Sequence, residues 1–172
     1  TGVVKSLPME AFYGLSYLAE VYFPAVTYIG TDGIARNAYL TSISLPQVVS
    51  VSQYGIAFNG LTNIDLPQAE RLSYYAIYGN GDLQTVNLPK VSWIGNSCFA
   101  NCDKLTDVYL GRRESIVTFN SANNTFDWCS STLKIHVPSE LYDAYISKYG
   151  YYSYIWSTGR RRYYQDVFVS DL

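Results

Sequence analysis

The side chains best suited to chemistry in this sequence are one histidine and three cysteines. A lone imidazole needs a nucleophile or a carboxylate beside it to act as a general base, and His136 has no such neighbour along the chain. We therefore interpret His136 as a surface or capping residue. The short motifs of common hydrolases, zinc proteases and phosphate-binding loops do not occur, and the carboxylates follow no pairing pattern. We predict a protein that is not an enzyme, with no catalytic residue and no cofactor.

The three cysteines, Cys98, Cys102 and Cys129, are too few and too irregularly spaced for a zinc site or a disulfide scaffold. Cys102 and Cys129 fall in the same column of a sequence repeat. Because adjacent strands of a stacked sheet lie about 4.8 Å apart, a disulfide between them is one alternative. We favour free, buried thiols, because side chains in such a column point inward without facing each other. We predict no metal site.

The composition narrows the classes of protein that fit. Of the 172 residues, 48% are hydrophobic and 15% are charged, which is enough apolar surface for a core. A net charge of −2 argues against a nucleic-acid binder. No run of about 18 apolar residues occurs, so we predict no membrane span. The chain starts at Thr1 with neither Met nor an apolar leader, which we interpret as a processed or truncated piece without its targeting segment.

A repeat of about 22 residues organises the chain. A Leu-Pro or Phe-Pro dipeptide recurs with prolines at positions 24, 46, 67 and 89, which are spaced 22, 21 and 22 apart. An apolar residue stands six before, three before, two after, five after and ten after each proline. The column thirteen after the proline holds asparagine or cysteine, namely Asn37, Asn59, Asn80 and Cys102.

Each column has a physical reason. The pattern Leu-x-x-Ile-x-Leu puts apolar side chains at alternate positions, which is typical of a short strand. Proline ends the strand because it lacks the N–H that the next pairing needs. The Val-x-x-Ile stretch after the proline predicts a second short extended segment. The asparagine column predicts side chains that bond to backbone groups of neighbouring rungs.

The unit from Leu83 to Lys104, LQTVNLPKVSWIGNSCFANCDK, resembles the BspA-like, or Treponema-type, leucine-rich repeat of bacterial surface proteins. The resemblance covers roughly residues 18–138. It implies a leucine-rich-repeat-like solenoid, which is a right-handed superhelix of stacked short parallel strands and turns with little helix. It also implies a C-terminal helical cap, secretion or display on a bacterial cell, and adhesion to host matrix proteins or other bacteria.

We divide the chain into three regions. Residues 1–17 form a partial N-terminal repeat. Residues 18–138 form the leucine-rich repeat array, with four clear units, a fifth with an insertion at about 111–125, and a closing strand. Residues 139–172 form a C-terminal cap helix and tail. We expect the cap to cover the open end of the core, because a solenoid requires such closure.

Two outward columns are candidate binding surfaces. One lies on the first strand of each unit, and the other lies four residues after each proline and contains Tyr28, Arg71 and Trp93. Tyrosine, tryptophan and arginine are the residues that most often anchor interfaces. The alternatives are an ordinary solvated sheet face and, for Trp93, a ring that only covers a rung. The candidate binding residues are Tyr22, Tyr28, Asp65, Arg71, Asn87, Trp93 and Tyr109.

The sequence thus predicts an extracellular or cell-surface binding or adhesion module. We expect it to be monomeric and to recognise a protein or glycan partner rather than a nucleic acid. The alternative is a rigid structural spacer of a larger surface protein, with no ligand of its own. A contiguous exposed patch of Tyr28, Arg71 and Trp93 would favour binding.

Overall fold

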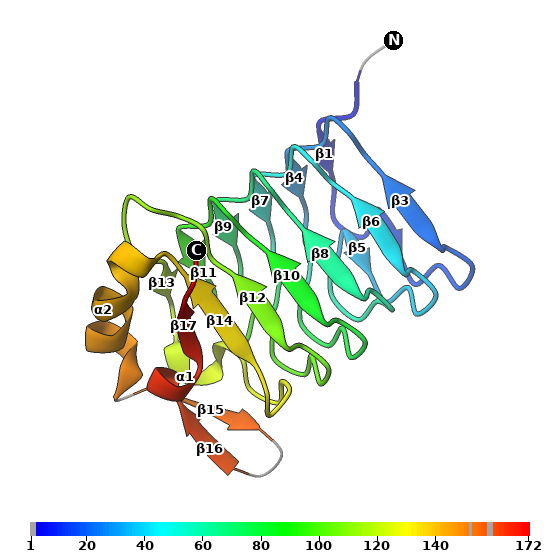
Figure 1. Cartoon of the computed structure of the whole chain (residues 1–172). Helices are drawn as coiled ribbons and strands as arrows, with labels where there is room; N and C mark the ends of the chain where they lie inside the picture. Colours follow the sequence, from blue (N-terminus) through cyan, green and yellow to red (C-terminus); the bar gives the residue numbers. More distant parts are fainter. Residues whose placement is uncertain (1–2, 152, 158–159) are drawn as a thin grey trace.

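The computed structural model describes residues 3–151, 153–157 and 160–172, which form a stack of short coils. Figure 1 shows the stack running from the N-terminus at one end to a helical region at the other. Most coils contribute one strand to each of two parallel sheets on different sides of the stack. Residues 1–2 of the predicted N-terminal repeat, and residues 152 and 158–159 of the predicted tail, lie outside the described residues.

The longer sheet is made of two-residue strands that follow the prolines. Each pairs in parallel with its counterpart one unit away, as in Arg71 with Trp93. This confirms the second extended segment predicted for each unit. In spatial order the strands are β1 (Ser6–Leu7), β4 (Tyr28–Ile29), β7 (Ser50–Val51), β9 (Arg71–Leu72), β11 (Trp93–Ile94) and β13 (Thr118–Phe119).

The second sheet is made of the strands that precede the prolines, again parallel and in register with the repeat. Its order is β8 (Asn63–Asp65), β10 (Thr85–Asn87), β12 (Asp107–Tyr109), β14 (Lys134–Val137) and β17 (Phe168–Ser170). Two further parallel pairs lie toward the N-terminus, namely β3 (Glu20–Tyr22) with β6 (Ser42–Ser44) and β2 (Phe12–Tyr13) with β5 (Ile34–Ala35).

The core lies between the two sheets and is filled by the repeat columns. The leucines six before the proline (Leu40, Leu61 and Leu83) are fully buried, although Leu18 of the first unit is only partly so. Because no single coil can enclose its own apolar side chains, the core is continuous along the stack and depends on neighbouring coils.

The asparagine column forms a buried ladder between coils. The N–H of Asn37 donates to Oδ1 of Asn59 at 3.0 Å, and the N–H of Asn59 donates to Oδ1 of Asn80 at 2.9 Å. The Asn80 amide donates to the carbonyl oxygens of Ile56 and Ile77. These bonds confirm the predicted role of the column, and they give buried backbone groups the partners that burial demands.

The corners of the coils use left-handed backbone at two repeated positions, eight and twelve residues after the proline. Tyr54 and Tyr75 occupy the first position in successive coils, and their rings stack with centroids 4.9 Å apart. Phe58 and Gly79 occupy the second. The Phe58 ring fills the space where a Gly79 side chain would stand, because a Cβ added there would lie 2.8 Å from the ring.

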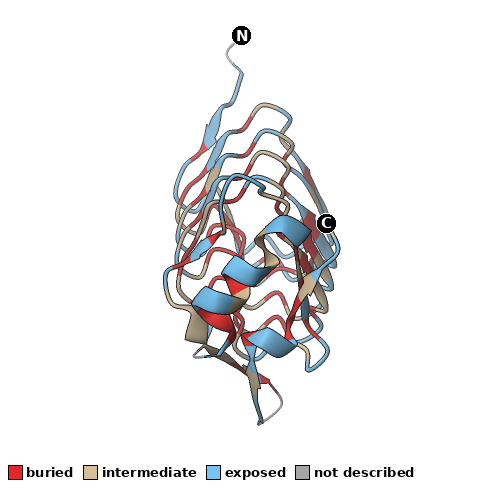
Figure 2. Ribbon diagram, turned by 60° about the vertical axis from the view of Figure 1, so that its left-hand side comes forward, coloured by how far each residue is buried: buried red, intermediate tan, exposed pale blue. Residues whose placement is uncertain are grey.

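The C-terminal region closes the stack, as Figure 2 shows from its end. A 3-10 turn (Ser139–Leu141), α2 (Tyr142–Tyr145) and a π-helical turn (Ile146–Gly150) follow one another without a break. The Tyr145 hydroxyl accepts a hydrogen bond from the N–H of Val117 at 2.9 Å, and the Tyr149 hydroxyl donates to the carbonyl of Val117 at 3.1 Å. Two buried tyrosines therefore fasten the helical region to the last coil.

The tail folds back on the same end. Strands β15 (Tyr154–Ser157) and β16 (Arg160–Tyr163) form an antiparallel hairpin. A 3-10 turn (Tyr164–Asp166) then leads into β17, which pairs in parallel with β14. The predicted insertion contains β13 and the short helix α1 (Ala122–Thr125), which the sequence did not indicate.

Candidate binding surface

The outward column of the longer sheet brings the most suggestive side chains together. Its register runs from Tyr28 to Ser50, then to Arg71 and on to Trp93. Arg71 and Trp93 are therefore neighbours, as the sequence predicted. Tyr28 is separated from them by Ser50, and its hydroxyl lies 3.3 Å from Oγ of Ser52. The three residues do not form one contiguous patch.

Arg71 and Trp93 make a close contact across the sheet. The Arg71 guanidinium carbon lies 3.8 Å from the centroid of the Trp93 ring, which is the geometry of a cation–π interaction. Tyr74 packs edge-on against the same ring, with centroids 5.7 Å apart and planes at 84°. Arg71 and Tyr74 are exposed, and Trp93 is partly buried. We call Arg71, Tyr74 and Trp93 the Arg71 cluster.

Contacts within the cluster restrain its side chains. Parallel pairing fixes the two backbones, and the indole gives the guanidinium a flat surface to lie on. Trp93 is half-buried, so its ring packs partly against the coil and is partly open to solvent. Side chains that are already restrained lose less conformational entropy when a surface binds a partner.

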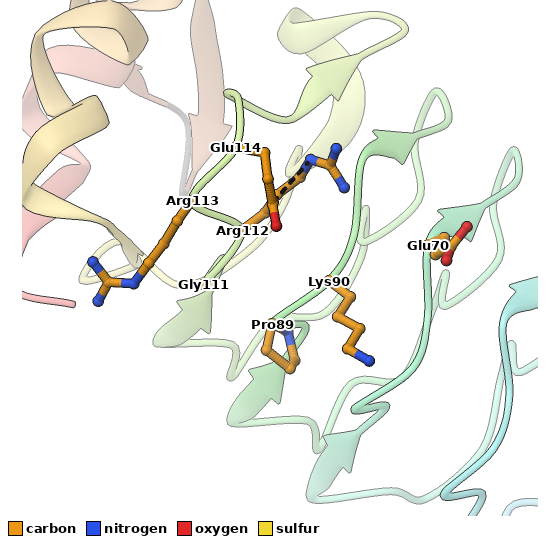
Figure 3. A pocket seen from close by; sticks show the side chains of 7 residues that line it. All are labelled: Glu70, Pro89, Lys90, Gly111, Arg112, Arg113 and Glu114. Carbon is orange, nitrogen blue, oxygen red and sulfur yellow. Dashed lines mark ion pairs between the residues drawn. The ribbon is translucent and has the colours of Figure 1, made fainter.

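A hollow of about 440 Å³ opens beside the cluster, at the corner where the insertion leaves the stack (Figure 3). Glu70, which directly precedes Arg71, lies on one side of it, and the Lys90 side chain lies between Glu70 and the insertion. Arg113 points away and pairs with Glu140 at 2.6 Å. The full lining is Glu70, Pro89, Lys90, Gly111, Arg112, Arg113 and Glu114.

The corner hollow is open and carries charges of both signs. Arg112 and Glu114 form a long ion pair at 3.8 Å. Gly111 stands where other units have proline, and a Cβ there would lie 3.3 Å from Pro89. The insertion can therefore fold closely over the previous coil, and Glu70 is the lining residue that adjoins the Arg71 cluster in the chain.

The remaining candidates lie on the second sheet and its N-terminal extension. Asp65 and Asn87 are adjacent, and the Asn87 amide donates to Asp65 at 2.9 Å. Tyr109 stacks on His136 with ring centroids 4.3 Å apart. Tyr22 is 69% exposed on β3, and Ser44 lies beside it in the next strand. This face is polar, and its candidate residues form separate contacts rather than one cluster like that around Arg71.

His136 has partners that the local sequence does not show. Its Nε2 lies 2.8 Å from Asp107, and its Nδ1 lies 2.8 Å from Asp171, a residue of the C-terminal tail. The donor and acceptor roles in these contacts depend on the tautomer of the imidazole ring. Burial raises the pKa of Asp107, but hydrogen bonds from His136 and Thr106 and the charge on His136 outweigh it, so the pKa is lowered.

The cysteines are free and buried, as predicted. The Cys102 thiol donates to the carbonyl of Ile77 at 3.5 Å, and the Cys129 thiol donates to that of Phe99 at 3.2 Å. Both thus continue the asparagine ladder. Burial raises the pKa of Cys102 to about 12, so the reactive thiolate is disfavoured.

The described residues offer no group of three or more His, Cys, Asp or Glu side chains placed to hold a metal ion. Over the same ranges, no helix has the length and apolar character needed to cross a bilayer.

Sequence reasoning missed Tyr74. The column seven after the proline otherwise holds Thr31, Gln53 and Asn96, so an aromatic residue there is an outlier that could have drawn attention. It also missed the exposed rings of the β15–β16 hairpin, for which the repeat gives no signal.

The coils, parallel sheets and asparagine ladder define a leucine-rich repeat solenoid. The model of the BspA type leucine-rich repeat region matches residues 2–106 and 50–154, in six copies overall, and the chain belongs to this family. No curated protein matches the chain in sequence.

Two solved structures are similar to it. The pneumococcal vaccine antigen PcpA matches over 98% of this chain and 42% of its own, with a TM-score of 0.68 and 15% identity. A leucine-rich repeat protein from Bacteroides ovatus matches over 78% and 43%, with a TM-score of 0.46 and 18% identity. The chain thus spans less than half the length of either, and at this identity the likeness to PcpA shows the fold alone.

Proposed function

We propose that this chain is an extracellular or cell-surface binding module that recognises a protein or glycan partner and performs no catalysis. The Arg71 cluster and the adjacent corner hollow would form its contact surface. The single observation that carries the proposal is the Arg71 guanidinium held 3.8 Å from the centroid of the Trp93 ring on the outward column of the longer sheet.

The chemistry of this surface favours a protein partner over a glycan. Tryptophan, tyrosine and arginine dominate the binding energy of protein interfaces when they cluster at the centre of the contact. The hollow adds Glu70, Lys90 and Glu114, charges of both signs that can pair with a mixed protein surface. Family membership supports placement outside the cell.

A rigid spacer is the second candidate, and the second sheet favours it. The outward residues of β6, β8 and β10 are mostly small and polar, including Ser42, Ser44, Asn63 and Thr85. Such a face has little to anchor a partner.

A binding screen separates the two functions. The purified chain is tested on panels of immobilised matrix proteins and glycans, together with Trp93→Ala and, on the second sheet, Tyr22→Ala. We expect wild type and Tyr22→Ala to capture the same partner and Trp93→Ala to lose it. Capture of nothing by wild type supports the spacer, and equal capture by Trp93→Ala contradicts the proposed surface.

A further inference from the structure

The β15–β16 hairpin has two faces, and the architecture accounts for one of them. Ile155 and Ser157 point inward and are almost fully buried. The Ser157 hydroxyl donates to the carbonyl of Cys129 at 2.6 Å, and the N–H of Trp128 donates to the carbonyl of Trp156 at 2.6 Å. The inner side of the hairpin thus supplies hydrogen-bond partners to the last corner of the stack. The outer face has no such structural role.

The outer face is aromatic and cationic. Strand register places Trp156 opposite Arg161 and Tyr154 opposite Tyr163, so all four side chains share it. The Arg161 guanidinium lies 4.5 Å from the Tyr154 ring centroid and 5.8 Å from that of Trp156. Trp156 is 36% exposed and Tyr163 is 40% exposed. These rings hold a guanidinium at the surface in a fixed orientation.

A charged hollow of about 580 Å³ lies at the hairpin and is lined by Ser131, Ser157, Arg160, Arg161 and Arg162. Strand register places Arg160 and Arg162 on the inner face, so Arg161 is the residue that the hollow shares with the aromatic outer face. Arg162 is partly fixed, because it donates to the carbonyls of Leu133 and Asp166, each at 3.3 Å. Arg160 and Arg161 are exposed, and within the described ranges neither forms an ion pair with a carboxylate. The hollow therefore presents positive charge that the chain itself leaves without a counter-ion.

Trp128 extends the surface. It is 51% exposed, and its backbone is tied to Trp156. Two indole rings thus lie on segments that are bonded to each other, beside the arginines. Large exposed rings that lie together on a protein surface mark a contact site more often than single scattered rings do.

We infer that the hairpin face binds a carboxylate-bearing sugar of an acidic polysaccharide. The forked guanidinium of Arg161, together with Arg160, would take the carboxylate in a two-point contact. The Ser131 hydroxyl would bond to sugar hydroxyls, and the indole rings would cover the apolar face of the ring. This site is separate from the Arg71 cluster, so it stands or falls independently of the proposed function.

Two other anionic partners fit less well. An acidic peptide needs either a groove for side chains or a docked strand, whereas this hollow is lined by hydroxyl and guanidinium groups. An anionic bilayer attracts many mobile cations near its surface, but here the cation is restrained between rings and only two arginines are free. A restrained fork beside hydroxyls matches a sugar that carries one carboxylate.

The test measures binding of the whole chain to two carboxylated polysaccharides, polygalacturonate and polysialate, by biolayer interferometry at about physiological salt. Fully methyl-esterified pectin is the matched neutral ligand, because it keeps the backbone of polygalacturonate and removes its charge. Arg161→Gln and Arg160→Gln are the test variants, and Lys134→Gln is the control, because it removes one exposed positive charge on β14.

We expect at least one carboxylated polysaccharide to bind, each arginine variant to weaken it by tenfold or more, and Lys134→Gln to stay within twofold of wild type. Esterified pectin should not bind. Absence of binding to both polymers, or equal binding by Arg160→Gln, overturns the inference. Among the described residues the Arg160 side chain forms no hydrogen bond or ion pair, so its variant serves even if Arg161→Gln is destabilised. Tighter binding to polyglutamate or to phosphatidylglycerol vesicles would overturn the ligand class.

Discussion

The Arg71 guanidinium lies 3.8 Å from the centroid of the Trp93 ring, one coil further along the same parallel sheet. Neither residue is part of the buried core, and the solenoid would stack with small residues at both positions, as it does at Ser50. The contact therefore adds little to the fold, and we propose that it serves binding by holding an arginine and an indole in a fixed arrangement.

The first prediction concerns the strength of that contact. A double-mutant cycle of Arg71→Ala and Trp93→Ala should give a coupling energy of about 0.5–1 kcal/mol, the range for exposed cation–π pairs. Urea unfolding of the four proteins measures it. A parallel cycle of Ser50→Ala with Trp93→Ala should give almost none, since these residues are two coils apart. Equal coupling in the two cycles would mean that the cation is irrelevant.

The second prediction concerns the corner glycines. Gly79→Ala should destabilise the fold by about 2 kcal/mol or more, because Gly79 has a left-handed backbone and a new Cβ would meet the Phe58 ring at 2.8 Å. Gly81→Ala is the matched control, since a Cβ there meets nothing within 4 Å. Its effect should stay within about 0.5 kcal/mol. Unfolding midpoints that fall equally for both would contradict this account of the corner.

The third prediction concerns the buried ladder. Asn80→Ala removes the acceptor for the N–H of Asn59 and the donor to Ile56 and Ile77, so it should cost roughly 2–4 kcal/mol. Asn80→Cys should cost distinctly less, because Cys102 occupies the same column and donates to Ile77. Chemical denaturation ranks the two variants. Equal losses would show that the thiol cannot replace the amide.

The fourth prediction concerns acid stability. The pKa of Asp107 is lowered in the fold, so its carboxylate stabilises the native state above the unfolded value of about 3.9. That stabilisation is lost as the pH falls below this value and through the folded pKa. Asp107→Asn should therefore lose less stability than wild type between about pH 5 and pH 2.

The same acid titration includes an internal control. His136→Gln removes hydrogen bonds to Asp107 and Asp171, so it should flatten the acid dependence as Asp107→Asn does. The double variant should add little to either single one. Fully additive effects would show that the two residues contribute to acid stability independently.

Features of the fold that arise from contacts within the repeat could be predicted from the sequence, and features that arise from contacts between distant residues could not. The strand columns, the prolines and the asparagine ladder follow from one repeated unit, because each coil makes the same contacts with the next. Tyr74 stands out in its column as the one aromatic residue, but its contact with Trp93 is known only from the structure. The His136 partners come from Asp107 and Asp171, 29 and 35 residues away, and no periodicity links them.

The structure of the C-terminal end was the least predictable from the sequence. The repeat stops there, so nothing in its columns indicates that Trp156 and Arg161 pair across a hairpin or that the N–H of Trp128 donates to the carbonyl of Trp156. The helical cap was predictable as a need of the open core. The two tyrosine hydroxyls that fasten it, from Tyr145 and Tyr149, depend on tertiary contacts alone.

The central claim is that the Arg71 cluster is the contact surface for a partner. The most direct test is the ratio of dissociation constants of Trp93→Ala and Ser50→Ala for a partner captured in the binding screen, since both residues lie in one outward column. Loss of a central interface anchor costs about 2 kcal/mol or more, which is roughly thirtyfold in affinity. We predict at least that ratio. Equal affinity for the two variants would contradict the claim.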